Sequence, residues 1–263
     1  MSSDSDIRPA ISASLIVPIR NEGPELVERF GPFAGRPDCE LIATDGGGSR
    51  EAIERLAARG ARIVAFEGTR GRCLDEAARK AAGEILLFFH ADSRPPDDAV
   101  EAAREALSGG AAAGAFSLAY EGAGPAMRWI ASWANLRSRL LRLPFGDQGL
   151  FCPRSIYFRA GGFRDLPVCD DLDFLRRIRR IGRIVIRPEK TVTSPRRYRR
   201  NGVLRQVLRS WRVQVGFFAG VAPETLARWY AGRATRPEPA GRRPSVERPV
   251  LAPGPTSPPR RSG

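Results

Sequence analysis

The amino-acid sequence predicts an α/β fold built on a mostly parallel sheet that is flanked by helices. Short apolar segments alternate with segments of helical periodicity over the first 110 residues, which is the order of βαβ units. The short segments are apolar along their whole length, as strands are when helices cover both faces of a sheet. Acidic residues follow three of these segments closely, at the edge where such sheets bind ligands.

The first half of the expected domain contains four strands and four helices. The strands are apolar, partly β-branched runs at residues 13–19, 40–44, 62–66 and 85–89. Apolar side chains at helical spacing predict helices at residues 22–33, 50–59, 72–82 and 96–107. Ser49 precedes the second helix and is a favourable residue to cap it. Residues 13–110 therefore form one half of the domain.

The regular alternation of strand and helix patterns ends after residue 110, and the second half of the domain is expected at residues 111–230. Its expected elements are strands at residues 114–120 and 183–187 and helices at residues 126–142, 171–181, 203–218 and 223–230. Residues 1–12 are expected to be a flexible N-terminus. Residues 231–263 contain eight prolines and few large apolar residues, which predicts a disordered tail.

The net charge of +14 comes largely from one region of the chain. Between residues 176 and 212, fourteen basic residues stand against one acid, Glu189. This region contains Tyr198 but no series of interleaved aromatic side chains on which bases would stack. The sequence therefore gives no reason to expect nucleic acid as a partner.

The cysteines and the hydropathy pattern indicate a cytoplasmic protein. The four cysteines are widely spaced, with no Cys-x-x-Cys pair, so we expect buried thiols in a reducing compartment and neither zinc nor disulfides. No apolar run is long enough to cross a bilayer, and the acidic, polar N-terminus lacks the layout of a signal peptide.

Three acids follow predicted strands and are the first candidates for a binding site. Glu22 follows the first strand, Asp45 the second and Asp92 the fourth. The carboxyl ends of parallel strands meet at one edge of a sheet, where three carboxylates repel one another unless a cation or a hydrogen-bond donor lies between them. The pattern predicts a site for ribose hydroxyls, a base edge and a metal-bound diphosphate.

Six short motifs resemble family 2 glycosyltransferases of the GT-A fold. They are V-P-x-x-N-E at 17–22, T-D-G-G-G-S at 44–49, H-A-D-S at 90–93, G-D-Q-G at 146–149, D-D-L-D-F at 170–174 and S-P-R-R at 194–197. In order and spacing, the chain is similar to a small bacterial subgroup of single-domain enzymes over roughly residues 13 to 230. The resemblance implies that residues 13–110 bind a nucleotide sugar and that residues 111–230 carry the acceptor and catalytic groups.

The resemblance also implies roles for individual residues. The donor site would be formed by Pro18, Asn21, Glu22, Asp45, Gly46, Arg70, Arg72, Ala91 and Asp92. Asp92 would hold Mg²⁺ or Mn²⁺, with His90 as a second ligand in a position where many relatives have an acid. Arg196 and Arg197 would contact the diphosphate, to which guanidinium groups are suited.

The acceptor side and the base follow from the same resemblance. Asp147, Gln148 and Trp133 would line the acceptor side. Asp171 would be the general base that removes the proton of the acceptor hydroxyl, and single displacement would invert the anomeric carbon. Asp170 stands where relatives have Glu, so Asp170 and also Asp173 remain candidates for the base.

Several alternatives stay open at this stage. Residues 67–71 (EGTRG) are similar to a glycine-rich phosphate loop, which would fit a sugar-phosphate nucleotidyltransferase. A non-catalytic protein that binds membrane or nucleic acid through its arginines is a second alternative. The basic amphipathic segment 204–218 fits packing onto the domain, and it also fits an anionic membrane surface. The latter would suit a peripheral protein at the inner face of the membrane and a lipid-linked hydroxyl acceptor.

Overall fold

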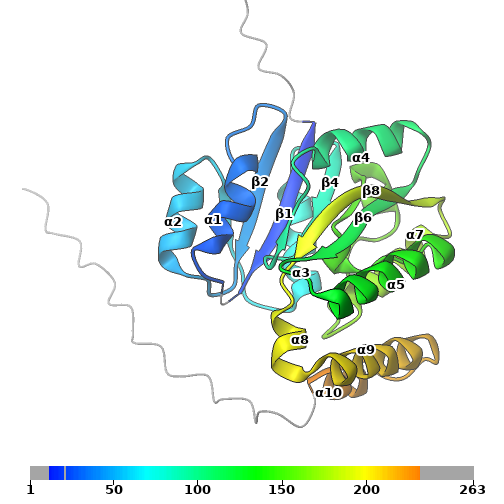
Figure 1. Cartoon of the computed structure of the whole chain (residues 1–263). Helices are drawn as coiled ribbons and strands as arrows, with labels where there is room; N and C mark the ends of the chain where they lie inside the picture. The colour runs from blue at the N-terminus through cyan, green and yellow to red at the C-terminus, as the bar shows by residue number, and fades with distance from the viewer. Residues whose placement is uncertain (1–11, 21, 232–263) are drawn as a thin grey trace, which may run out of the picture. The chain divides into compact units, whose positions relative to one another are not determined.

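The computed structural model describes residues 12–20 and 22–231, and these residues are arranged around one eight-stranded sheet (Figure 1). Along the sheet the strand order is β3-β2-β1-β4-β7-β6-β8-β5. The strands are β1 (Ala13–Ile19), β2 (Cys39–Asp45), β3 (Arg62–Ala65), β4 (Ile85–Phe88), β5 (Ser93–Arg94), β6 (Ala113–Tyr120), β7 (Leu150–Pro153) and β8 (Ile184–Thr193).

Ten α-helices and two 3₁₀ turns, η1 and η2, connect the strands of the described residues. In the first half these are α1 (Glu25–Phe30), η1 (Gly31–Phe33), α2 (Arg50–Ala58), α3 (Arg70–Lys80) and α4 (Ala99–Ser108). In the second half they are α5 (Pro125–Leu141), η2 (Gly146–Gln148), α6 (Arg154–Arg159), α7 (Asp170–Ile178), α8 (Arg196–Asn201), α9 (Val203–Phe218) and α10 (Pro223–Ala231).

The strands β3, β2, β1 and β4 form the parallel part of the sheet, as the sequence predicts. Because they are parallel, the residues that follow β1, β2 and β4 lie at the same edge. The other strands form a mixed part, in which β7 is antiparallel to β4 and β6, β6 is parallel to β8, and β5 is antiparallel to β8. The α/β fold class predicted from the sequence is confirmed.

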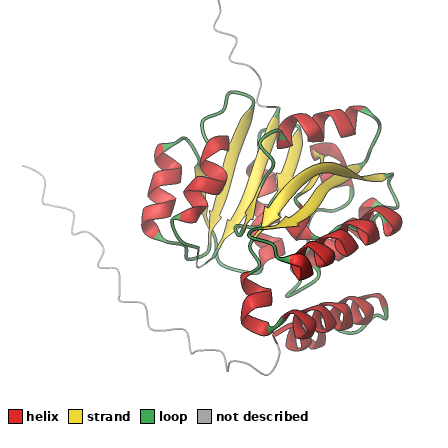
Figure 2. Cartoon of the chain, viewed as in Figure 1, coloured by secondary structure: helices red, strands yellow, loops and turns green. Residues whose placement is uncertain are grey.

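Helices cover both faces of the sheet (Figure 2), which explains why the strands are apolar throughout. Alternate residues of a strand point to opposite faces. Leu15 of β1 accordingly packs in a cluster with Leu26 of α1 and Leu56 of α2. Its neighbour Ile16 belongs to a second cluster, with Leu74 of α3 and residues of α6 and α7.

Most predicted elements agree with the structure to within one to three residues, and Ser49 caps α2 by accepting from the backbone N–H of Ala52. The sequence did not predict the short elements β5, η2, β7, α6 and α8. The strand predicted at residues 183–187 continues as β8 to Thr193. Its second part contains Pro188, Glu189 and Lys190, and this proline with two charged residues hides the strand in the sequence.

The structure also bears on the predictions for the cysteines, for membrane-spanning helices and for the two ends of the chain. Of the four cysteines, three are buried and Cys169 is half-buried, which agrees with the expected burial. No helix among the described residues is long and apolar enough to cross a membrane. The predictions for residues 1–11, for Asn21 and for residues 232–263 lie outside the described residues.

Candidate active site

The candidate site lies where β1, β2 and β4 end and where segments from the second half of the chain reach them. The loop after β1 and the glycine-rich turn after β2 are joined by backbone hydrogen bonds from Gly46 to Ile19 (2.9 Å) and from Ser49 to Glu22 (3.1 Å). After β4, the carbonyl of Asp92 accepts from the N–H of Ser194 (3.1 Å). These bonds join the first motif to the second, and the third motif to the last, at this edge.

Asp45 shapes the glycine-rich turn. One oxygen of its carboxylate accepts from the N–H groups of Gly47 and Gly48, both at 2.9 Å. Gly47 has a φ of 109°, a conformation that side chains larger than glycine rarely adopt. The turn is thus ordered by Asp45 itself, and the second carboxylate oxygen of Asp45 makes no recorded hydrogen bond in the described part of the chain.

Arg70 of α3 connects three parts of the site. Its guanidinium donates two hydrogen bonds to Asp170, at 3.0 and 2.6 Å, and lies 3.6 Å from Asp171. It also contacts Nε2 of His90, which follows β4. Burial opposes the charge of Arg70, but the carboxylates of Asp170 and Asp171 raise the pKa of its guanidinium above the ordinary value. This bidentate ion pair joins α3 to the start of α7.

His90, which the resemblance gives as a metal ligand, faces the guanidinium of Arg70 as a neutral acceptor. Burial lowers the pKa of His90 well below its usual value, and the charges of Arg70 and Arg197 lower it further. The guanidinium of Arg70 can only donate, so the adjacent Nε2 of His90 is the unprotonated nitrogen. The lone pair that a cation would need at Nε2 is therefore already used.

Asp171 is the more exposed carboxylate of the pair, with 16% of its side-chain surface accessible against 5% for Asp170. Its Oδ2 accepts from the backbone N–H of Gly146 (2.8 Å), and its Oδ1 accepts from the N–H of Leu172 (2.8 Å). A Cβ atom on Gly146 would lie 2.7 Å from Nε2 of His90 and 3.1 Å from both Asp171 and Arg70. Only glycine leaves room for the backbone to come this close.

The start of α7 is set by an unusual backbone conformation. Cys169, the residue before the helix, has a φ of 61° and lies in the left-handed region. This conformation costs a non-glycine residue about 1–2 kcal/mol, and such strain is often found at functional sites. The sharp corner places Asp170 and Asp171 in the first turn, where the helix dipole favours negative charge.

Asp147 has an unpaired oxygen inside the site. Its Oδ1 is buried and has no hydrogen-bond partner among the described residues. Burial, with the nearby carboxylates of Asp171 and Asp92, raises the pKa of Asp147 to about 6, although Arg137 and Arg197 act in the opposite direction. The electrostatic influence of both other acids on Asp147 indicates that the three carboxylates share one region.

Gln148, predicted on the acceptor side, holds this loop in place from inside the domain. The side chain is fully buried. Its amide oxygen accepts from Ser138 (2.7 Å) and from the N–H of Phe145 (3.1 Å), and its amide nitrogen donates to the carbonyl of Phe116 (3.1 Å). Since these bonds use both ends of the amide, Gln148 positions η2 from inside.

The start of α8 reaches the same edge. Arg196 donates to Glu22 at 2.8 Å, joining residues 174 positions apart. Arg197 donates to the hydroxyl of Tyr230 at 2.5 Å, and its charge acts on both Asp147 and His90. Both arginines are exposed and adjoin the acids.

Other predicted site residues are less central. Arg72 is exposed, with its guanidinium over the ring of Phe66 at 5.7 Å. Pro18 is in β1 beside Thr44, and Ala91 is buried next to Asp92. Trp133, predicted on the acceptor side, lies on the exposed side of α5 against Trp129, opposite the residues of α5 that contact β6.

Two residues that matter for the site were not singled out from the sequence. Arg137 of α5 lies with its guanidinium 3.6 Å from the centroid of Phe145 and acts electrostatically on Asp147. Thr193 donates to the carbonyl of Asp147 at 3.2 Å. Neither position has a sequence signal, because their role depends on how α5 and β8 meet η2.

Comparisons with known proteins agree with this architecture. The pattern described as "Glycosyl transferase family 2" matches residues 14–166. A mannosyltransferase from Pyrobaculum calidifontis, PcManGT, solved with GDP-Man and Mn²⁺, is similar with a TM-score of 0.57 and 21% identity over 77% of this chain and 61% of that one. TarS from S. aureus, solved with UDP-GlcNAc, has a TM-score of 0.56 and 15% identity over 70% and 58%. No curated protein is similar enough to match.

These structures share the GT-A type of α/β fold that the sequence predicts. The family pattern covers more than half of the 263 residues, so the chain belongs to glycosyl transferase family 2. It spans about three fifths of the length of the two similar structures.

Proposed function

We propose that this protein is an inverting, metal-assisted glycosyltransferase that moves a sugar from a nucleoside diphosphate sugar to a hydroxyl acceptor. The observation that carries the proposal is the cluster of Asp171, Gly146, Arg70 and His90 at the carboxyl edge of the parallel strands. A reaction of this kind needs a carboxylate to take the proton of the acceptor and positive charge for the leaving diphosphate.

Asp171 is the best candidate for the base. Asp170 is almost fully buried and forms a bidentate pair with Arg70, so its oxygens are not free for an acceptor. Asp173 is buried between Arg177 and Arg164 and has a structural role. Asp171 keeps a partly exposed carboxylate that the N–H of Gly146 orients.

The acids next to Asp171 fit a divalent cation that is shared with the donor. Asp92 would hold Mg²⁺ or Mn²⁺. The buried oxygen of Asp147 has no hydrogen-bond partner among the described residues, and a nearby cation would stabilise the charge of this carboxylate. Among the described residues, no three acid, His or Cys side chains form a complete metal-binding set. An ion such as Mg²⁺ takes many of its ligands from phosphates and water, so Asp92 would share it with the phosphates of the donor. When bound, the cation neutralises charge that develops on the leaving group.

The remaining donor contacts follow from the edge of the sheet. The free oxygen of Asp45 would accept from the nucleoside, as the resemblance implies. Arg196 and Arg197 would contact the diphosphate, since both are exposed beside the acids and guanidinium binds phosphate in a bidentate way.

The test is the exchange Asp171→Asn, which keeps the size of the side chain and removes its basicity. We expect transfer from the donor to fall at least about 100-fold, the lower range for loss of a general base, while calorimetry detects donor binding close to that of the wild type. Asp97→Asn, an exposed carboxylate on the surface, is the matched control and should keep full activity.

Two results would contradict the proposal. Transfer by Asp171→Asn at the wild-type rate would refute the base assignment. Release of pyrophosphate from a nucleoside triphosphate and a sugar 1-phosphate would favour the nucleotidyltransferase that residues 67–71 suggested. In the structure, Thr69 of that segment caps α3, and Arg70 is committed to the carboxylate cluster.

A further inference from the structure

The helix α5 exposes an apolar stripe on the side away from the sheet. Trp129, Trp133, Leu136 and Leu140 recur every three or four residues, so they lie on one face of the helix. Trp129 is 68% and Leu140 72% exposed, and the two tryptophan rings are stacked with centroids 6.5 Å apart. The opposite face of α5 carries the buried residues Ile130, Ala131 and Ser138. The stripe therefore has no part in the core.

The helix α9 repeats this arrangement. Its exposed apolar residues are Leu204, Leu208, Trp211, Val215 and Phe218, again at helical spacing. Its buried residues are Gln206, Val213 and Gly216. The sequence left open whether this amphipathic helix packs onto the domain with its apolar face, and the structure exposes that face.

The two helices run side by side in the same direction. Val207 near the start of α9 packs in a cluster with Ile130 and Ala131 of α5. Further along, Arg137 of α5 donates to Gln214 of α9 at 3.5 Å. Near their ends, Leu141 and Phe218 line a common pocket. The contacts thus advance along both helices together, and the two helices lie near one another in Figure 1.

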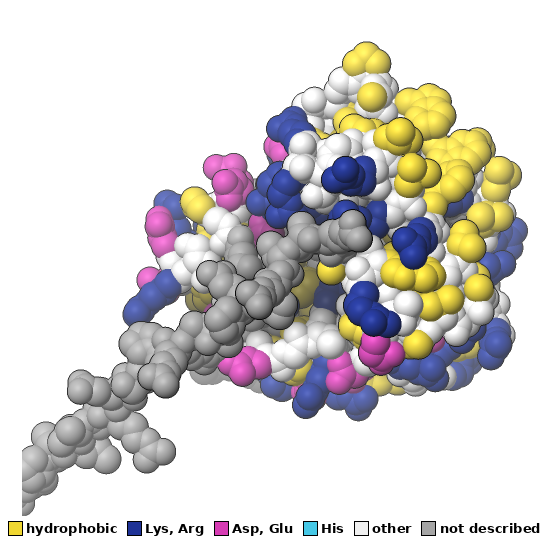
Figure 3. Space-filling view, turned by 90° about the horizontal axis from the view of Figure 1, so that it is seen from below, with side chains coloured by type: hydrophobic (Ala, Val, Ile, Leu, Met, Phe, Trp, Pro, Cys, Tyr) yellow, Lys and Arg dark blue, Asp and Glu magenta, His cyan; other side chains and the backbone are white. Residues whose placement is uncertain are grey.

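The two stripes lie on the same outer side of this helix pair. Going around the axis of α5 from the face that packs on the sheet, one meets first the contact with α9 and then the apolar stripe. Going around the axis of α9 from its buried residues, one meets first the contact with α5 and then the apolar stripe of α9. Helical spacing at 100° per residue therefore places both stripes next to the seam and facing outward. Figure 3 shows hydrophobic side chains gathered along one side of the molecule, with Lys and Arg side chains beside them.

The charge of the helix pair selects the kind of partner. Neither α5 nor α9 contains an acidic residue, and each contains three arginines. A second copy of this chain would bring the same positive charges against them, which is unfavourable. An apolar surface on two helices whose only charged residues are arginines fits a partner with an apolar interior and an anionic surface, which describes a phospholipid bilayer.

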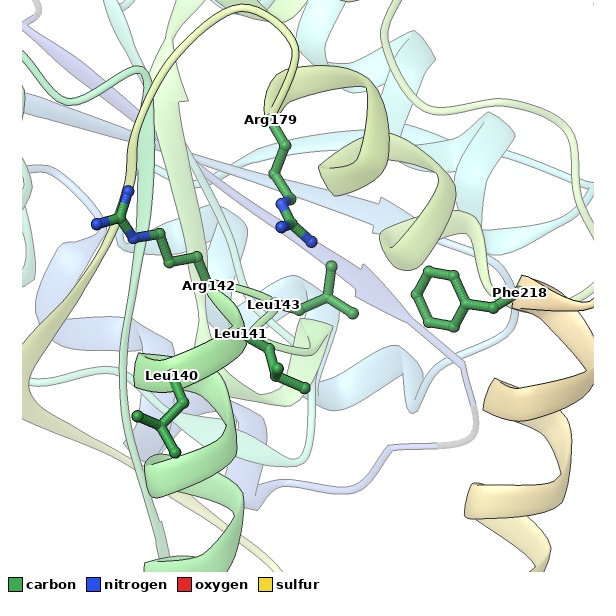
Figure 4. Close-up of a pocket in the computed structure, with 6 residues that line it drawn as sticks. All are labelled: Leu140, Leu141, Arg142, Leu143, Arg179 and Phe218. Carbon is green, nitrogen blue, oxygen red and sulfur yellow. The ribbon is translucent and has the colours of Figure 1, made fainter.

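A pocket at the end of the seam has the same character. It has a volume of about 530 Å³ and is lined by Leu140, Leu141, Arg142, Leu143, Arg179 and Phe218 (Figure 4). Four of these side chains are apolar and two are guanidinium groups, so the pocket offers one surface for hydrocarbon and another for a phosphate. The pocket therefore combines apolar and positively charged side chains, as the surface of the helix pair does.

We propose that α5 and α9 together form a docking face that binds an anionic phospholipid bilayer. The apolar stripes enter the boundary between headgroups and acyl chains, and the arginines beside them lie at the level of the lipid phosphates. This inference does not depend on the transfer reaction, because it rests only on the surface of the two helices.

The test is sedimentation of the full chain with vesicles, without any sugar donor. We expect binding to vesicles of phosphatidylcholine with about one quarter phosphatidylglycerol, and at least about tenfold weaker binding to phosphatidylcholine alone or at high salt. Trp133→Ser combined with Leu208→Ser should weaken binding at least about tenfold. The control is Phe158→Ser, a similarly exposed apolar residue on α6, which should bind like the wild type.

A second pair of variants isolates the charge. Arg205→Gln with Arg212→Gln should weaken binding to the anionic vesicles, whereas Arg50→Gln with Arg55→Gln on α2 should not. Circular dichroism checks that each variant is folded. Equal binding to neutral and anionic vesicles, or no binding at all, would overturn the proposal. So would a concentration-dependent dimer that the Trp133/Leu208 variant abolishes while vesicle binding stays absent.

Discussion

Asp147 carries an oxygen that is buried without a hydrogen-bond partner, beside two other carboxylates. Its folded-state pKa of about 6 lies above the ordinary 3.8, so between these pH values the folded protein keeps a proton that the unfolded chain has lost. Stability from this group is therefore present at low pH and is lost as pH rises through 6. At neutral pH the buried, ionised carboxylate of Asp147 therefore lowers the free energy of unfolding, as expected of a residue kept for function and not for stability.

Replacing this side chain should make that cost measurable. Asp147→Asn removes the charge, so we expect the variant to be more stable than the wild type at pH 8, by up to about 3 kcal/mol. The difference should vanish near pH 4, where the wild-type carboxyl is protonated. Urea unfolding of both proteins at the two pH values measures this difference in the free energy of unfolding. A difference that is the same at both pH values would mean that charge is not the cause.

At the scale of elements, η2 is held against α7 by a backbone contact that only glycine permits. In Gly146→Ala the new methyl group would overlap His90 and press on Asp171 and Arg70. We expect transfer to fall about 100-fold, because a displacement of about 1 Å at reacting groups costs that much, while the protein stays folded. Gly124→Ala is the control, since nothing lies within 4 Å of a Cβ atom there. Normal activity of Gly146→Ala would show that this contact is not needed.

The sequence predicted the parallel part of the sheet well, because strands covered on both faces are continuous apolar runs between helices of clear periodicity. It missed β7, which has only four residues and owes its pairing with β4 to tertiary contacts. It also missed the polar second part of β8. Local pattern predicts an element only where burial and periodicity coincide.

The site was predicted in outline for a similar reason. Acids at strand ends can be found from the sequence, since strand direction gathers them at one edge. The contact between Arg70 and Asp170, which are 100 residues apart, cannot be found that way. Nor does the sequence tell that His90 faces a guanidinium or that Gln148 faces inward, because side-chain direction depends on packing between α3, α5 and α7.

At the scale of the whole molecule, binding of the donor should stabilise the fold. A ligand at about 100 times its Kd raises the free energy of unfolding by about 2.7 kcal/mol. We expect one class among UDP, GDP and dTDP sugars to raise the melting temperature, with a larger rise in the presence of Mn²⁺. Asp92→Asn should lose the part that depends on Mn²⁺. If no nucleotide sugar shifts the melting temperature, the donor class is wrong.

The four arginines of α8 are exposed, and α8 begins two residues after Ser194, which is bonded to Asp92. A concentrated positive field beside an opening accelerates the arrival of anionic molecules and weakens as ionic strength rises. We therefore expect kcat/KM for a nucleotide sugar to fall steeply with added salt while kcat stays nearly constant. Steady-state kinetics at several ionic strengths would measure this, and equal salt dependence of both constants would contradict it. On this expectation, the arginines of α8 govern how fast the donor is captured and leave the rate of the chemical step unchanged.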